Sequence, residues 1–140
     1  MKKIMLVGLC IVLLTGCFGG TKTLTCTKTE TDIWEMDMKI AMDFRNDEAT
    51  FINMDIKLTL DAEYAEFVDM FMESLEEEFE ELKKQGWEVK MDSSGTVITI
   101  NFKADVDKLQ DATNDFFDMD LTKGFEANKA EAEAEGFECK

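Results

Sequence analysis

Four cysteines have the most constrained chemistry in this sequence, because a thiol can carry a lipid, form a disulfide or act as a nucleophile. They are Cys10, Cys17, Cys26 and Cys139. A nucleophilic thiol needs a partner that lowers its pKa, and the chain has no histidine and no C-x-x-C spacing. The four positions therefore favour attachment and cross-linking over catalysis.

The first residues have the pattern of an export signal. Two lysines follow the first methionine, and the apolar run 4–14 comes next. This run is too short to cross a hydrocarbon core, which takes about 20 residues of helix. A short positive stretch followed by a short apolar run is typical of a secretory signal.

The apolar run ends in the motif Leu14-Thr15-Gly16-Cys17. A small residue directly before a cysteine at this position matches the lipobox of bacterial lipoproteins, in which a lipid is attached to the thiol and a peptidase cuts before it. The motif predicts a signal peptide over 1–16, lipid attachment at Cys17 and a lipidated tether over 17–21. We expect the cell membrane as a partner through this lipid, on the outer face of the cytoplasmic membrane or in a periplasm. The alternative is an ordinary cleavable signal with an incidental cysteine.

Two cysteines remain in the mature chain after Cys10 leaves with the signal and Cys17 is lipidated. Cys26 lies near the start of that chain and Cys139 next to its last residue. An even pair in an exported, oxidising compartment favours a disulfide, which would tie the C-terminus to the first strand. Two free thiols, one of them catalytic, are the alternative.

The charge balance is strongly acidic, with 31 Asp and Glu against 15 Lys and Arg in 140 residues. Binding to nucleic acid needs a basic face, so we expect no nucleic-acid partner. Removal of the signal takes away two lysines and no acid, which changes the formal charge from −16 to −18. Such a charge can steer a cationic protein, a peptide or a divalent metal toward the surface.

Three groups of side chains could hold a metal ion, and each has a simpler explanation. They are the glutamates Glu76, Glu77, Glu78, Glu80 and Glu81, the aspartates Asp115, Asp118 and Asp120, and the methionines Met36, Met38 and Met42. The glutamates spread around a predicted helix surface, where Lys83 and Lys84 can pair with them. The aspartates lack the glycine and closing glutamate of an EF-hand loop, and the methionines share a strand face with core residues. We therefore expect no metal, no cofactor and no catalytic site.

Strands are predicted at the start of the mature chain. The Thr-rich stretch 21–28 suits a short strand. Apolar residues alternate strictly with other residues over 34–44 and again over 52–60, which predicts the two half-buried strands of a hairpin.

The register of this hairpin follows from charge. A three-residue loop at 46–48 sets Lys39 opposite Asp55 and Asp37 opposite Lys57. A shift by two residues would place Lys39 opposite Lys57, and like charges directly opposite are unfavourable.

The clearest helix is predicted over 61–85, where apolar residues recur every fourth position. They are Phe67, Phe71, Leu75 and Phe79, with Val68, Met72 and Leu82 beside them. Acidic residues at the start, lysines at the end and Gly86 after the end suit the helix dipole and a C-cap.

A second hairpin is predicted around Ser94-Gly95, with shorter helices after Asp105 and over about 122–135. We expect three facing pairs in this hairpin, Trp87 with Phe102, Val89 with Ile100 and Met91 with Ile98. The order of elements predicts one α+β domain over 22–140. Its antiparallel sheet has two hairpins plus an N-terminal strand, and one face is covered by a long helix and one or two shorter helices.

The layout resembles the YehR-like lipoproteins of bacteria, a family of unknown function. The matching features are the lipobox cysteine Cys17, the segment 24–30 around Cys26, the alternating hairpin through Leu60, the long helix, and the ending Gly136-Phe137-Glu138-Cys139-Lys140. The likeness covers nearly all of the mature chain, and the placement of Cys26 and Cys139 at its two ends is the most specific part. The resemblance implies a single small α+β domain with a bridge between these cysteines, and it carries over no catalytic residue.

These features lead us to expect a monomeric, non-enzymatic lipoprotein outside the cytoplasm that acts as a binding or envelope-structural module. One alternative is capture of a cationic protein, peptide or divalent metal by the acidic surface, which would be sensitive to salt. Another is a carboxylate-dependent hydrolase acting on envelope polymers, which needs two inward-facing carboxylates in a cleft. No spacing in the sequence selects such a pair.

Overall fold

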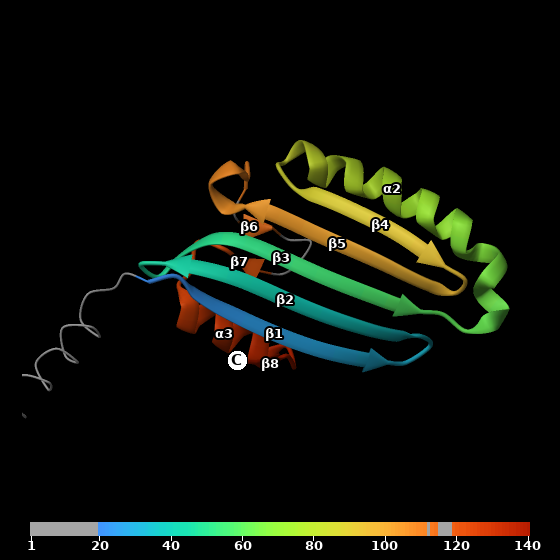
Figure 1. Cartoon of the computed structure of the whole chain (residues 1–140), viewed down its shortest axis with the longest axis horizontal. Coiled ribbons are helices and arrows are strands. Elements are labelled where there is room, and N and C mark those ends of the chain that lie inside the picture. The colour runs from blue at the N-terminus through green and yellow to red at the C-terminus, as the bar shows by residue number, and fades with distance from the viewer. Residues whose placement is uncertain (1–19, 112, 115–118) are drawn as a thin grey trace, which may run out of the picture.

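A six-stranded antiparallel sheet with the strand order β4-β5-β3-β2-β1-β8 forms the framework of the domain (Figure 1). The computed structural model describes residues 20–111, 113, 114 and 119–140. The strands are β1 (Lys22–Thr31), β2 (Glu35–Arg45), β3 (Glu48–Thr59), β4 (Glu88–Ser94), β5 (Val97–Asp105) and β8 (Glu138–Cys139). The helices are α2 (Val68–Lys84), α3 (Phe125–Ala134) and the 3-10 helices η1 (Ala62–Phe67) and η2 (Val106–Lys108). The α+β class is confirmed, and a short pair that was not predicted, β6 (Thr113–Asn114) with β7 (Met119–Asp120), adds to it.

Both α-helices pack on the same face of the sheet. Phe79 of α2 meets the ring of Phe102 edge-on with 5.0 Å between the centroids, and Phe125 of α3 meets Phe44 in the same way at 5.4 Å. Phe44 and Phe102 belong to the alternate residues of β2 and β5 that point into the core. The opposite face, toward the viewer in Figure 1, has no helix over it in the described part of the chain. We call it the open face.

The β2–β3 hairpin has the predicted register along most of its length. Lys39 lies opposite Asp55 and Asp37 opposite Lys57. The predicted pairing of these charged residues is therefore confirmed, and the pairs lie on the open face, where cross-strand pairs are worth roughly 0.2–1 kcal/mol each.

The turn of this hairpin differs from the prediction. A three-residue loop would pair Phe44 with Thr50, but Phe44 pairs with Ala49. Asn46 and Asp47 form a two-residue turn with φ values of 52° and 64°, which short polar side chains tolerate better than others. A register shift beside Phe44 takes up the extra residue as a bulge.

The predicted β4–β5 register is wrong by two residues. Phe102 faces Val89 rather than Trp87, and the other two predicted pairs shift with it. Only two residues separate the paired ends of these strands, which is a common hairpin loop. The observed register also places Glu88 opposite Lys103, an opposite-charge pair that the predicted register would have lost.

The long helix begins later than its apolar pattern suggests. Residues 62–67 form η1, and α2 covers only Val68–Lys84. Because a 3-10 helix has three residues per turn, a stripe at every fourth position does not stay on one face through it. Phe67, predicted to be buried, is 47% exposed as a result.

The later helices are shorter than predicted. The helix after Asp105 is the single turn η2, and the helix predicted over 122–135 covers Phe125–Ala134. The chain turns out of α3 at Gly136, whose φ is 89°.

Candidate functional site

The predicted lipid-attachment residue Cys17 and its lipobox neighbours Leu14, Thr15 and Gly16 lie outside the described residues. The sheet begins shortly after them at Lys22. Within residues 20–111, 113, 114 and 119–140, no helix is both long enough and apolar enough to cross a membrane.

The predicted cysteine pair lies where β8 joins the edge of the sheet. Cys26 of β1 faces Cys139 of β8, with 4.1 Å between the Cα atoms and 2.03 Å between the Sγ atoms, as in a disulfide. Thr25 and Lys140 exchange backbone hydrogen bonds beside them, at 3.1 and 2.8 Å. Cys26 is 1% exposed. The structure thus places these cysteines as a cross-link of the core rather than as reactive surface thiols.

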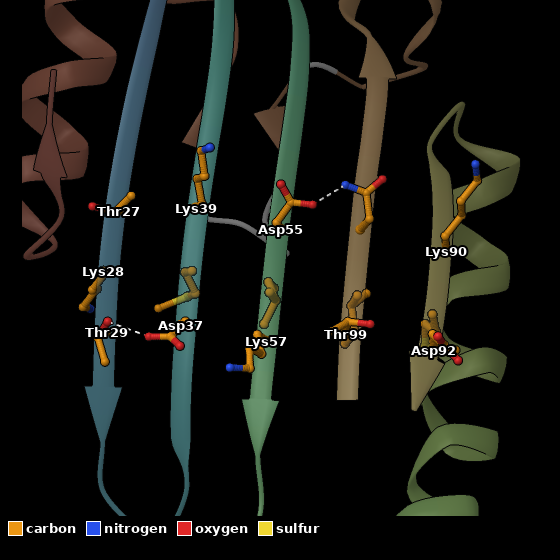
Figure 2. Close-up of a pocket in the computed structure, with 15 residues that line it drawn as sticks. Thr27, Lys28, Thr29, Asp37, Lys39, Asp55, Lys57, Lys90, Asp92 and Thr99 are labelled. Atoms are coloured by element: carbon orange, nitrogen blue, oxygen red, sulfur yellow. Dashed lines mark hydrogen bonds between the residues drawn. The ribbon is translucent and has the colours of Figure 1, made fainter. Parts of the chain in front are cut away.

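A groove crosses the strands on the open face (Figure 2). Its volume of about 770 Å³ lies in the range of ligand sites. Its walls are two rows of outward-facing side chains, and we call it the open-face groove. One row is Thr27, Lys39, Asp55, Asn101 and Lys90, and the other is Thr29, Asp37, Lys57, Thr99 and Asp92.

Strand register produces these rows. Each member of a row is the cross-strand partner of the next member, from β1 through β2, β3 and β5 to β4. Because side chains alternate along a strand, a residue on one wall and the residue two positions away on the other wall point to the same face. On β2, β3 and β4 these two positions hold one lysine and one aspartate. The two rows therefore carry balanced charge in a strongly acidic chain, and Lys28, which also lines the groove, adds one positive charge.

Each of the three aspartates of the groove accepts a hydrogen bond from an uncharged donor. Thr29 donates its hydroxyl to Asp37 at 2.7 Å, and the Asn101 amide donates to Asp55 at 2.6 Å. Asp92 accepts a hydrogen bond from the next backbone N–H at 2.9 Å. Each carboxylate thus has a hydrogen-bond partner other than a lysine.

The three lysines of the two rows have no ion-pair partner. Lys39, Lys57 and Lys90 lie within 4.0 Å of no carboxylate oxygen of a described residue, unlike Lys28, which also lines the groove and pairs with Glu30. Their ammonium groups are exposed on the open face and can donate to an incoming ligand.

The groove walls offer hydrogen-bond donors and acceptors from lysine, threonine, asparagine and aspartate side chains. The walls hold no thiol and no imidazole. A carboxylate that acts as a general acid needs a raised pKa, commonly through burial. Among the described residues, the only buried polar or charged side chain is Asn128, which donates to the Lys123 and Gly124 carbonyl groups at the start of α3.

The glutamates of α2 pair with the lysines at its end, as predicted. Glu80 accepts a hydrogen bond from Lys83 at 2.7 Å, and Glu81 from Lys84 at 3.3 Å. The bond from Lys83 lowers the pKa of Glu80 and raises that of the lysine. No group of three or more Asp, Glu or Cys side chains in the described ranges is arranged to hold a metal ion.

The other candidate metal groups do not form a site in the described part of the chain. Asp115 and Asp118 lie outside it, and Asp120 accepts hydrogen bonds from the hydroxyl and the backbone N–H of Thr122. Met42 belongs to the hydrophobic core and is 1% exposed, and Met36 packs against that core, whereas Met38 is half-buried and lines the open-face groove.

The charged pairs between β2 and β3 were predicted only as a means of fixing the hairpin register, and no groove was predicted from the sequence. The sequence pattern missed Lys90, Asp92, Thr99 and Asn101, because the placement of β5 beside β3 and of β4 at the edge is a long-range property of the sheet. A local signal was present, since these polar residues alternate with apolar ones along each strand and so belong to its wet face.

Comparison with known proteins shows the fold alone. No protein family model matches the chain, and no curated protein matches it. An NMR structure of a protein from Streptococcus pneumoniae TIGR4 is similar, with a TM-score of 0.60, 14% sequence identity and 86% of each chain covered. The resemblance to YehR-like lipoproteins therefore stays a prediction.

Proposed function

We propose that this chain is a lipid-anchored protein outside the cytoplasm that binds an extended polar ligand in the open-face groove and catalyses no reaction. One observation carries the binding role: three lysines without ion-pair partners stand in the groove beside three aspartates that neutral donors already hold. Those lysines can bond a ligand without first breaking an internal ion pair.

The shape of the groove indicates a short extended peptide. Neighbouring strands lie about 4.8 Å apart, so five strands span about 19 Å, the length of about six extended residues. Because opposite walls carry opposite charge on three strands, a ligand with both acidic and basic groups can satisfy both walls. No aromatic ring lines the walls, so the groove offers no surface for stacking a planar ligand.

The anchoring role rests on the sequence motif at Cys17, and the fold is compatible with it. The chain enters β1 at Lys22 at one end of the sheet, so a short tether would hold that end near the bilayer (Figure 1). A lipid on the thiol would add about 0.8 kcal/mol of membrane affinity per buried CH₂, and two or more chains give stable attachment.

Binding is tested by titrating the soluble domain, residues 18–140, with a hexapeptide of alternating Lys and Glu. Backbone amide NMR signals of 27–29, 37–39, 55–57 and 99–101 should shift. The double variant Lys39→Ser/Lys57→Ser should bind at least about tenfold more weakly, and Lys84→Ser on the opposite side of the domain serves as the control. Groove signals that do not shift at millimolar peptide would refute binding in the groove. Equal weakening of peptide binding by Lys84→Ser would refute it as well.

Anchoring is tested separately in the producing bacterium. The wild-type protein should partition into detergent and show an added acyl mass on an N-terminal cysteine. Cys17→Ser should be soluble or unprocessed. Equal partitioning of the wild-type protein and Cys17→Ser would contradict the lipid anchor and would not affect the proposal of binding in the groove.

Capture of a cationic protein or peptide by the acidic surface is a second candidate function. The observation that favours it is the exposure of the acidic residues along α2, where Glu73, Glu76, Glu77 and Glu78 form no ion pair with a described residue. Binding of decalysine should weaken at least about tenfold between 20 and 200 mM NaCl, because salt screens exposed charges. Binding that is independent of salt would contradict this function.

A further inference from the structure

Among the residues that the structure describes, five large apolar side chains are exposed, against the general tendency of such residues to be buried. They are Ile33 at 62%, Trp34 at 43%, Tyr64 at 36%, Phe67 at 47% and Met70 at 63% exposure. The sequence pattern placed Trp34 on the core face of a strand and Phe67 on the core face of a helix. Positions where local pattern and fold disagree in this way are often functional.

Four of these residues lie on the β1–β2 turn and η1, and Met70 lies near the start of α2, directly after η1. Ile33 and Trp34 form the β1–β2 turn, closed by a hydrogen bond from the Asp32 N–H to the Trp34 carbonyl oxygen at 3.2 Å. Glu35 at the start of β2 pairs with Thr59 at the end of β3, from which the chain enters η1. The β1–β2 turn and η1 therefore lie at the same end, the right-hand end of Figure 1. We call the five residues the apolar tip.

The surroundings of the apolar tip are acidic. Segments 29–38 and 58–82, which carry all five residues, contain no lysine and no arginine. The exposed acidic residues between and beside them are Asp32, Glu35, Asp61, Glu63, Glu66 and Asp69. An apolar centre with a charged rim is the usual anatomy of a protein interface, and exposed Trp, Tyr and Phe are its typical anchors.

We infer that the apolar tip is a docking surface for a protein partner that presents apolar side chains within a ring of lysine or arginine. Charge complementarity selects this occupant. An anionic bilayer surface would be repelled by the acidic rim, and a second copy of the tip would bring two acidic rims together. β1 extends about 33 Å from the end where the chain enters the sheet to the tip, at about 3.3 Å per residue. The tip thus lies away from that end, and the inference depends on neither the groove nor the lipid anchor.

Trp34 provides a direct reporter. The chain has two tryptophans, and Trp87 is 3% exposed, so the variant Trp87→Phe leaves Trp34 as the single tryptophan. The probe is a helical 14-residue peptide with leucines on one face and lysines on the other. Its controls are the same peptide with glutamate for lysine and with serine for leucine. The soluble domain is used, with circular dichroism to confirm that each variant is folded.

Docking predicts a blue shift of Trp34 emission with the leucine–lysine peptide and none with either control peptide. Binding followed by calorimetry should weaken at least about tenfold in Ile33→Ser/Phe67→Ser and about threefold or more in Glu35→Gln/Glu66→Gln. Lys57→Ser in the groove should leave the affinity for the leucine–lysine peptide unchanged.

Three results would overturn the inference. Equal binding of the serine–lysine peptide would show simple capture by charge. Stronger binding to vesicles of phosphatidylglycerol than to the peptide would identify a membrane surface. Self-association in ultracentrifugation that Ile33→Ser/Phe67→Ser abolishes would identify a second copy.

Discussion

The Asp47 carboxylate accepts a hydrogen bond of 2.8 Å from the backbone N–H of Phe125, a residue 78 positions later in the chain. Phe125 is the first residue of α3, and the residue before it, Gly124, provides no side-chain cap. The tight β2–β3 turn therefore supplies an N-terminal cap to a helix that is remote in sequence. A carboxylate at this position also interacts favourably with the helix dipole.

Replacement of this cap should weaken the domain. We expect Asp47→Ala to lower the free energy of unfolding by about 1 kcal/mol, the usual value of a cap, measured by urea denaturation. Asp47→Asn keeps a hydrogen-bond acceptor and the tolerance for positive φ. It should therefore lower the free energy of unfolding less than Asp47→Ala does. Glu48→Ala, at the residue that follows the turn, is the control, and a loss of stability equal to that of Asp47→Ala would show that the cap is not the cause.

Gly86 should tolerate no side chain. Its φ is 109°, and a Cβ atom would lie 2.7 Å from the carbonyl oxygen of Lys108. We expect Gly86→Ala to cost more than about 2 kcal/mol, because backbone strain and a clash with fixed backbone add together. Gly95→Ala is the matched variant, since φ is 62° there and the space is open, and it should cost about 1 kcal/mol. Equal thermal midpoints for the two variants would contradict this explanation.

The disulfide should account for a large share of the stability. In the chain-entropy account, closing a loop of about 100 residues gives about 4.7 kcal/mol, and removal of a native disulfide from a small secreted domain commonly costs 2–5 kcal/mol. We expect Cys26→Ser/Cys139→Ser to lose an amount in that range in urea denaturation. Wild-type protein treated with reductant should lose the same amount of free energy of unfolding. Peptide mapping without reductant should recover the cross-linked peptides, and two free thiols in the exported protein would disprove the pairing.

The pKa of Asp120 is below its ordinary value of 3.8, chiefly because the Thr122 hydroxyl and N–H donate to its carboxylate. Because the folded value is the lower one, the stabilisation is present above about pH 4 and is lost as the pH falls through the lowered value. Thr122→Val should raise this pKa toward 3.8, measured by carboxyl carbon NMR. Thr99→Val on the open face is the control and should leave the pKa of Asp120 unchanged.

Much of the sheet could be predicted because its determinants are local. Strict alternation along β2 and β3 identified two neighbouring strands, and the charges of Lys39 and Lys57 selected their register. In β4 and β5 the same reasoning relied on apolar pairs alone, which fit equally well after a shift of two residues. The pair Glu88 and Lys103 would have distinguished the two registers.

The groove and the apolar tip were harder to predict, because both depend on segments brought together by the sheet. The rows from Thr27 to Lys90 exist only once five strands are ordered. Trp34 and Phe67 fit a buried pattern by spacing, and only the turn and the 3-10 geometry of η1 leave them exposed. A periodic pattern records which residues share a face, but not whether another element covers that face.

The Cys26–Cys139 disulfide also determines what happens to the protein after proteolytic cleavage. A single proteolytic cut anywhere between Cys26 and Cys139 divides the chain into two fragments that stay covalently joined. Neither fragment is released from whatever holds the N-terminus, because the disulfide joins the two fragments. Only a cut before Cys26, in the short segment that leads into β1, would shed the domain whole.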